Sequence, residues 1–351
     1  MAESRRALTV NMHAGAYLGK RMKNTDLRLT GAFIVAACML FSLAANAQTR
    51  ASGPWWPNDE WGSEDQAGAS NRITEEKVME ALRLVTAGKI YELGQVYEQG
   101  MPLYGARSYS MVLPAKNAAR GENRLVGNEE FLSTQIGQVG TQFDGLGHIG
   151  QEVTMADGEV EYVFYNGFTS TEMDTPSGLK TLGIEHVRPI VTRGLLIDIA
   201  TYKEVQRLPN SYEVTVDDVL GTLERQGMST ADVRPGDAVL FRYGWSSLWD
   251  QPEAFNMNPP GIGLAVARWV AEREVTMVGS DSWPTEVIPN PNSNLAFPVH
   301  QELIMKNGIF NLENMQFDEL VADGVNEFLF IVTPIRFKGA TGSPVRPIAI
   351  R

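Results

Sequence analysis

An aspartate and a histidine stand four residues apart in a glycine-rich segment. Residues 137–150 read GQVGTQFDGLGHIG and contain Asp144 and His148. So many glycines disfavour a helix, but they let the backbone approach a ligand closely and aim side chains from a turn. A carboxylate and an imidazole placed in this way can bind a divalent metal or act as a base and its orienting partner. The alternative is a hydrogen-bonded pair that only stabilises the turn, and the local pattern leaves both open.

A second pair of candidate residues lies nearer the C-terminus. His300 is part of PVHQEL at residues 298–303, and Glu313 is part of GIFNLEN at residues 308–314. The two residues are separated by a helix-like stretch and a short strand. A histidine at the start of a helix is also typical of a cap or a surface residue, so this pair by itself predicts little.

Short apolar runs that alternate with helices must position these residues. Runs of this length are typical of buried strands, and the helices between them start at capping residues and stop near glycine. The predicted strands are residues 195–199, 238–243, 275–278 and 328–332. The predicted helices run from Thr74 to about residue 87, from Val216 (capped by Thr215) to about Gln226, and over residues 263–273. This order predicts a mixed α/β fold in a single domain, residues 73–351.

The segments with the candidate residues resemble the metal-dependent hydrolases of the cyclase family, which include bacterial kynurenine formamidase and isatin hydrolase. The family carries the signature H-x-G-T-H-x-D-x-P-x-H, and residues 138–148 read QVGTQFDGLGH. Its later P-V-H and G-I-x-x-x-E-N are matched by PVH at 298–300 and GIFNLEN at 308–314. Further matches are RPGD at 234–237, GSDS at 279–282 and GATGSPVRP at 339–347. The resemblance implies the cyclase-family fold, a single domain of a swivelling β/β/α-like type.

The resemblance also implies roles for the residues at matching positions. Asp144, His300 and Glu313 would be metal ligands, and His148 the general acid or base. Where the family has its two leading histidines, this sequence has Gln138 and Gln142. An amide oxygen is a hard, neutral ligand that suits manganese or magnesium better than zinc. We therefore expect one divalent ion, Mn²⁺ or Zn²⁺, with both glutamines as further ligand positions; a second ion is the alternative.

A divalent ion with open coordination positions activates water and polarises a carbonyl group. Together with the resemblance, this predicts a hydrolase that cleaves an amide, lactam or lactone bond in a small aromatic or cyclic compound. Aromatic side chains that could wall its pocket are Trp55, Trp61, Phe143 and Trp283, although each would serve equally well in a core. Two other functions stay open: a pseudoenzyme of the same fold that binds a small molecule or metal, and a metal-dependent lyase or dehydratase.

Composition excludes several classes of protein. The 351 residues are 43% hydrophobic and 21% charged, which is typical of a globular chain. The net charge of −12 argues against nucleic acid as a partner. The single cysteine, Cys38, excludes a disulfide framework and a cysteine-rich zinc module. The expected partners are a small-molecule substrate and, from the resemblance, further copies of the chain in a homodimer or larger homo-oligomer.

The N-terminus has the pattern of a targeting segment. Residues 29–45 form an uncharged apolar run that follows several basic residues and precedes a small-x-small site ending at Ala47. This predicts a signal peptide over residues 1–47, with Met22 as an alternative start, and no membrane span in the mature chain. We expect export to the periplasm; secretion, or a lipid anchor at Cys38, is the alternative. A Trp-rich N-terminal arm, residues 48–72, would then precede the domain.

Overall fold

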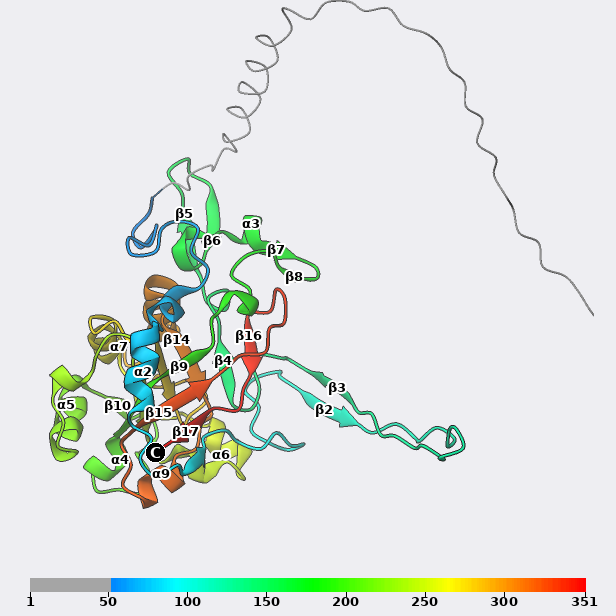
Figure 1. Ribbon diagram of the computed structural model, residues 1–351. Coiled ribbons are helices and arrows are strands. Elements are labelled where there is room, and N and C mark those ends of the chain that lie inside the picture. The colour runs from blue at the N-terminus through cyan, green and yellow to red at the C-terminus, as the bar shows by residue number, and fades with distance from the viewer. Residues whose placement is uncertain (1–51) are drawn as a thin grey trace, which may run out of the picture. The chain divides into compact units, whose positions relative to one another are not determined.

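A nine-stranded mixed sheet lies at the centre of the molecule (Figure 1). In this computed structural model, residues 52–351 are described. The strands of the sheet are β1 (Ile90–Glu92), β4 (Gln142–Asp144), β9 (Ile190–Asp198), β11 (Ala238–Arg242), β13 (Met277–Ser280), β14 (Phe310–Glu313), β15 (Glu327–Val332), β16 (Gly342–Pro344) and β17 (Ile348–Ile350). Their order is β1-β17-β15-β9-β11-β13-β14-β4-β16. Neighbours among β9, β11, β13 and β14 are parallel, and the remaining pairs are antiparallel.

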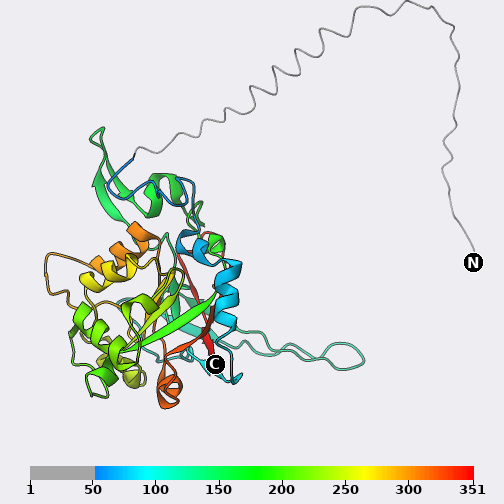
Figure 2. The ribbon, with the colours of Figure 1, turned by 60° about the vertical axis from the view of Figure 1, so that its left-hand side comes forward.

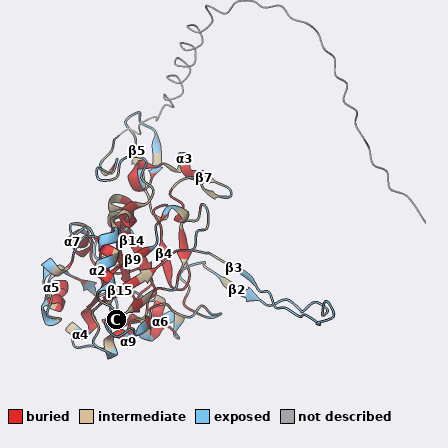
Figure 3. Cartoon of the chain, viewed as in Figure 1, coloured by how far each residue is buried: buried red, intermediate tan, exposed pale blue. Residues whose placement is uncertain are grey.

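Alternate side chains of the strands enter two apolar cores, one on each face of the sheet. Leu195 and Ile197 of β9 belong to the first core, whereas Leu196, between them, belongs to the second. Strand β11 alternates in the same way, with Val239 in the first core and Leu240 in the second. Successive side chains of a strand point to opposite faces, so a sheet covered on both faces needs apolar residues at every position. Figure 3 shows these buried residues gathered in the sheet.

Helices cover the first core. The parallel strands follow one another across the sheet in chain order, so right-handed crossovers place their connecting helices on one face. Those helices are α5 (Val216–Arg225), α7 (Leu264–Ala271) and α8 (Pro298–His300), the last continued by a wider π turn over Gln301–Lys306. The other helices are α2 (Glu75–Leu82), α3 (Ser170–Met173), α4 (Ile199–Tyr202), α6 (Pro252–Asn256) and α9 (Asp318–Ala322). Single helical turns lie at Gly68–Arg72, Tyr165–Gly167, Ile184–His186, Thr230–Asp232 and Trp245–Leu248.

A long hairpin projects from the body of the molecule (Figures 1 and 2). Its strands, β2 (Tyr109–Val112) and β3 (Phe131–Thr134), are antiparallel, and residues 113–130 connect them at the far end. Its exposed apolar side chains are Met111, Val112, Leu113, Leu125, Val126, Phe131 and Leu132. A two-stranded hairpin is marginally stable in water by itself, and a group of exposed apolar side chains usually marks an interaction surface.

Three smaller strand pairs complete the described structure. They are β5 (Gln151–Thr154) with β6 (Val160–Val163), β7 (Asp174–Thr175) with β8 (Gly178–Leu179), and β10 (Glu213–Val214) with β12 (Gly261–Ile262). The described part of the Trp-rich arm packs against the turn that follows β6. There the Asn58 N–H donates to Asn166 Oδ1 at 2.7 Å, and Asn166 Nδ2 donates to the Gly62 carbonyl at 2.8 Å.

The mixed α/β fold in a single domain is confirmed, and several predicted boundaries shift. The strand predicted to start at residue 195 begins at Ile190, and the helix predicted to reach residue 87 ends at Leu82. On this helix Leu82 is 44% exposed, whereas Lys77 is buried and pairs with Asp237 at 2.5 Å. A buried ion pair thus lies beneath the helix.

The predicted signal peptide, residues 1–47, lies outside the described residues, as do the alternative start at Met22 and the cysteine Cys38. Over residues 52–351, no helix combines the length and the apolar character needed to cross a membrane.

Candidate metal centre

Two short strands bring four polar side chains together. In the antiparallel pairing of β4 with β14, Gln142 lies opposite Glu313, and Asp144 lies opposite Asn311. Residues two apart on a strand share a face, so all four side chains lie on one face of the sheet, the face that α7 and α8 cover. Phe143 stands between two of them, points the other way and is fully buried in the second core. The sequences QFD and NLE therefore each contribute two polar groups to the site and one apolar group to the core.

His300 reaches this patch from the start of α8. Pro298 occupies the first helical position, and Phe297 before it has a φ of 47°, a left-handed conformation that bulky residues seldom adopt. Glu286 Oε1 lies 2.6 Å from His300 Nδ1 and also accepts the His300 backbone N–H at 3.1 Å. With Nδ1 held by this carboxylate, Nε2 faces Glu313 Oε1 at 3.2 Å. The ring is therefore oriented with one nitrogen toward the strands.

Asp144, His300 and Glu313 form a buried group of ligand atoms. One atom from each residue lies within 4.8 Å of the others, and no residue of the three is more than 5% exposed. Two carboxylates and an imidazole are donors that manganese and zinc accept. Metal-bound histidines usually donate their second nitrogen to a carboxylate, which is the contact that Glu286 makes. The donor set therefore fits a divalent cation.

Crowding of buried charge shifts the pKa values of this group. Burial raises the pKa of Glu313, and the neighbouring charge of Asp144 adds to this, bringing it to about 7. Burial would lower the pKa of His300, but its hydrogen bonds to Glu286 and Glu313 outweigh that effect and raise the pKa well above its usual value. Without a cation the cluster thus retains protons, and a metal that binds there must displace them.

His148 lies at the edge of the cluster, next to the amide of Gln138. Gln138 Nε2 donates to Asp144 Oδ1 at 3.0 Å and lies 3.4 Å from His148 Nδ1. Gln138 Oε1 accepts from the Arg107 guanidinium at 2.8 Å. Because a guanidinium only donates, Arg107 fixes which way the amide points. Burial lowers the pKa of His148, so the ring is neutral near pH 7, and an N–H facing Nδ1 leaves the ring proton on Nε2.

Two buried amides touch the carboxylates of the cluster. Gln142 Nε2 donates to Glu313 Oε2 at 2.7 Å, and Asn311 Nδ2 donates to both Asp144 Oδ2 and Glu313 Oε1, at 3.0 and 2.8 Å. The amide oxygens, Gln142 Oε1 and Asn311 Oδ1, are buried and find no hydrogen-bond partner among residues 52–351. Asn311 was not a candidate from the sequence. One asparagine inside a short strand has no distinctive signal, and only strand pairing places it opposite Asp144.

A cavity of about 170 Å³ opens beside the cluster. Its lining residues are Tyr104, Arg107, Gln138, His148, Ile149, Trp283, Pro284, Phe297, His300 and Glu313. The rings of Tyr104 and Trp283 stack with centroids 3.8 Å apart and planes 16° apart. Most ligand pockets exceed 300 Å³, so this cavity has room for a compact compound only. Aromatic side chains form one part of its wall, and polar side chains of the ligand cluster and Gln138 form another.

Trp283 alone of the four predicted pocket aromatics lines this cavity, and the other three placements are corrected here. Phe143 faces the core because side chains alternate along β4. Trp55 packs edge-on against Trp56 at 4.6 Å, and Trp61 lies under the Arg72 guanidinium at 4.6 Å. The arm that carries these tryptophans is tied to the turn after β6, and neither tryptophan is among the lining residues of the cavity.

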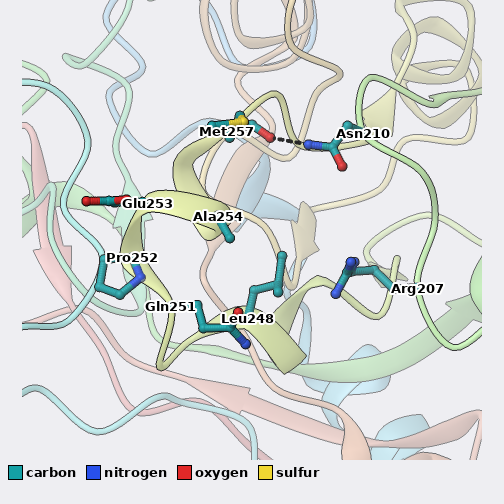
Figure 4. A pocket seen from close by; sticks show the side chains of 8 residues that line it. All are labelled: Arg207, Asn210, Leu248, Gln251, Pro252, Glu253, Ala254 and Met257. Carbon is teal, nitrogen blue, oxygen red and sulfur yellow. Dashed lines mark hydrogen bonds between the residues drawn. The ribbon is translucent and has the colours of Figure 1, made fainter.

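A larger hollow of about 830 Å³ lies elsewhere, around α6 (Figure 4). Its lining residues are Arg207, Asn210, Leu248, Gln251, Pro252, Glu253, Ala254 and Met257. In Figure 4 the Asn210 amide donates to the Met257 carbonyl, at 2.7 Å. The hollow shares no lining residue with the cavity beside the cluster, and within residues 52–351 its lining holds no group of metal-binding side chains. The buried group of ligand atoms therefore lies beside the smaller cavity and not beside this hollow.

A family model described as "Putative cyclase" matches residues 91–287, more than half of the chain. The chain belongs to this cyclase family. The predicted resemblance is thereby confirmed, and the matched range includes Asp144, His148 and Glu286.

Solved structures show the same cyclase fold. A novel cyclase is 28% identical, with a TM-score of 0.73, over 83% of this chain and 96% of that one. Isatin hydrolase A from Ralstonia solanacearum is 20% identical, with a TM-score of 0.56, over 75% of this chain and 92% of that one. Isatin hydrolase A from Labrenzia aggregata, bound to benzyl benzoate, is 20% identical, with a TM-score of 0.53, over 74% and 93%. No curated protein matches the chain.

Proposed function

We propose that this cyclase-family protein is a metal-dependent hydrolase that cleaves an amide, lactam or lactone bond in a small aromatic or cyclic compound. The observation that carries the proposal is the buried cluster of Asp144, His300 and Glu313, which opens onto a cavity with aromatic walls. A divalent ion in such a cluster polarises a carbonyl group and lowers the pKa of water. The fold shared with isatin hydrolases supports hydrolysis as the reaction.

We expect a single ion, with manganese ahead of zinc. The carboxylate and amide oxygens around the cluster outnumber its one imidazole, and oxygen donors favour manganese. A second ion would have to bind near Gln138, Gln142 and Asp144. The Arg107 guanidinium sits on Gln138 there, at 2.8 Å, and its positive charge opposes a second cation.

His148 is assigned the proton transfers. It lines the cavity, and its neutral ring can take a proton from the attacking water, become an imidazolium, and give a proton to the leaving nitrogen or oxygen. Asp144 Oδ1 lies 3.9 Å from Nε2 and stabilises the ring while it is charged. Gln138, fixed by Arg107, keeps the ring in this orientation.

The substrate is assigned from the walls of the cavity. Tyr104, Trp283 and Phe297 offer flat surfaces for an aromatic or cyclic group. Among the described lining residues, Arg107 is the only arginine or lysine. Hydrolysis of an amide or a lactone creates a carboxylate, and a guanidinium is the side chain best suited to pair with it. A neutral substrate that becomes an anionic product fits this lining.

The test is metal analysis followed by an activity screen. Protein purified without a histidine tag or chelator should carry one manganese or zinc ion per chain. It should hydrolyse cyclic amides, lactones or formamides in a cation-dependent manner, and the product should gain the mass of one water, whereas a dehydratase product would lose it. Asp144→Ala should lose both metal and activity. Wild-type protein that binds neither Mn²⁺ nor Zn²⁺ would refute the proposal.

We also propose that the protein is exported and forms a homodimer or larger homo-oligomer. The signal-peptide pattern of residues 1–47 supports export to the periplasm, and cleavage after Ala47 would appear in the mass of the mature chain. The exposed apolar side chains of the β2–β3 hairpin support self-association.

A further inference from the structure

The amide nitrogen of Asn311 occupies the middle of the ligand cluster. Asn311 Nδ2 lies 2.8 Å from Glu313 Oε1, 3.0 Å from Asp144 Oδ2 and 3.3 Å from His300 Nε2. These are the three residues whose ligand atoms gather within 4.8 Å of one another. The two protons of the amide NH₂ are taken by the carboxylates of Glu313 and Asp144, so the nitrogen stands where the ligand atoms of the cluster converge.

The other end of the same amide is left without a partner. Asn311 is 1% exposed, and its Oδ1 makes no hydrogen bond within the described part of the chain. Buried polar atoms are nearly always hydrogen-bonded, so an exception requires an explanation. Gln142 has the same arrangement: its Nε2 donates to Glu313 Oε2 at 2.7 Å, while its buried Oε1 has no partner there. Two amides thus direct nitrogen to the ligand carboxylates and leave oxygen unused.

We propose that Asn311 is itself a metal ligand, through Oδ1, with its amide turned so that oxygen rather than NH₂ faces Asp144 and Glu313. The inference rests on the proposed function, because it requires a divalent ion at this cluster. The oxygen and nitrogen of an amide exchange places by a rotation about the Cβ–Cγ bond. Oxygen directed at two carboxylates is repelled without a cation and becomes a ligand when one is present.

With this assignment, most of the metal ligands are oxygen atoms. Asp144, Glu313 and Asn311 supply oxygen, and Gln142, which lies opposite Glu313, supplies another when its amide turns about the Cγ–Cδ bond. His300 is then the one nitrogen ligand. A donor set of this kind selects hard divalent cations such as Mn²⁺ over Zn²⁺. Gln142, which stands where the family signature has a histidine, therefore supplies a harder donor than that imidazole would.

The experiment is calorimetric titration of the metal-free full-length protein with MnCl₂. Asn311→Leu keeps the branched shape of the side chain and removes both amide atoms; it should weaken Mn²⁺ binding at least about 10-fold, the lower limit for outer-shell changes at metal sites. Gln316→Leu is the matched control. Gln316 follows the same strand, and its amide donates to the Gly94 carbonyl at 2.8 Å, outside the cluster. This control should bind Mn²⁺ like the wild type.

Equal Mn²⁺ affinity in the wild type and in Asn311→Leu would overturn the inference and leave the proposed function standing. Failure of the wild type to bind Mn²⁺ or Zn²⁺ would instead overturn both. If Asn311→Leu does not fold, a crystal structure of the wild type with Mn²⁺ decides the matter. Asn311 Oδ1 should then lie about 2.0–2.6 Å from the ion, the range for oxygen ligands of hard divalent cations. An Nδ2 atom that faces the ion, or an amide turned away from it, would contradict the inference.

Discussion

Glu286 Oε1 lies 2.6 Å from Nδ1 of His300, and this contact turns the other imidazole nitrogen toward Asp144 and Glu313. The same carboxylate accepts the backbone N–H groups of Val299 and His300, at 3.4 and 3.1 Å. Glu286 thus fixes both the first turn of α8 and the direction of the ring that α8 carries.

Glu286→Gln should weaken metal binding about 10–100-fold without unfolding the protein. The one glutamine oxygen can still accept the backbone N–H of His300, but the acceptor for Val299 is lost. The negative charge that orients the imidazole and strengthens it as a donor is lost as well. The measurement is the Mn²⁺ dissociation constant, with a thermal unfolding curve as the check on folding. Glu302→Gln is the control, since Glu302 pairs with Lys306 at 2.9 Å and does not line the cavity. An unchanged dissociation constant in Glu286→Gln would show that ring orientation needs no carboxylate.

His148→Ala should lower turnover at least about 100-fold while the metal content stays at the wild-type level, since general acid–base groups contribute about 10²–10⁴-fold. Turnover and metal content are measured on the same preparation. His186→Ala serves as the control, because His186 is 40% exposed and outside the lining of the cavity. Loss of metal from His148→Ala would reassign the residue as a ligand.

Serine at both Val112 and Phe131 should reduce the protein to a smaller oligomer or a monomer. The two residues face each other across the β2–β3 hairpin and are 52% and 66% exposed. Exposed apolar groups gain free energy when a second copy covers them, and serine removes that gain without disturbing a core. Light scattering gives the molar mass in solution. Val160→Ser, at a 57% exposed position on β6, should keep the wild-type mass, and a monomeric wild type would refute self-association.

The family resemblance predicted the ligand cluster better than the aromatic residues predicted the walls around it. Asp144, His300 and Glu313 were expected as ligands, and the structure brings their ligand atoms together. Asn311 and Glu286 could not be predicted in this way, because strand pairing and the start of α8 bring them to the cluster from positions that have no sequence signal.

In the fold, too, some elements could be predicted from the sequence and others could not. The long buried strands are continuous apolar runs and were predicted near their observed positions. β4 and β16 have three residues each and mix polar with apolar types. Such short mixed sequences do not indicate a strand unless the neighbouring strands are known. Phe143 was misplaced for this reason. Its side chain is aromatic and adjacent to Asp144 in sequence, but alternation along β4 puts it on the opposite face.

The strand that carries Asp144 lies between β14 and β16, so its hydrogen bonds go to residues 310–313 and 342–344. During synthesis, a chain that has emerged only as far as Asp144 has neither partner strand, and the ligand cluster cannot form before nearly the whole chain is available. Contacts so distant in sequence also form slowly. If the chain is exported before it folds, as we propose, the ligand cluster would form only after export. The metal that it binds would then be one that is available in the compartment where folding ends.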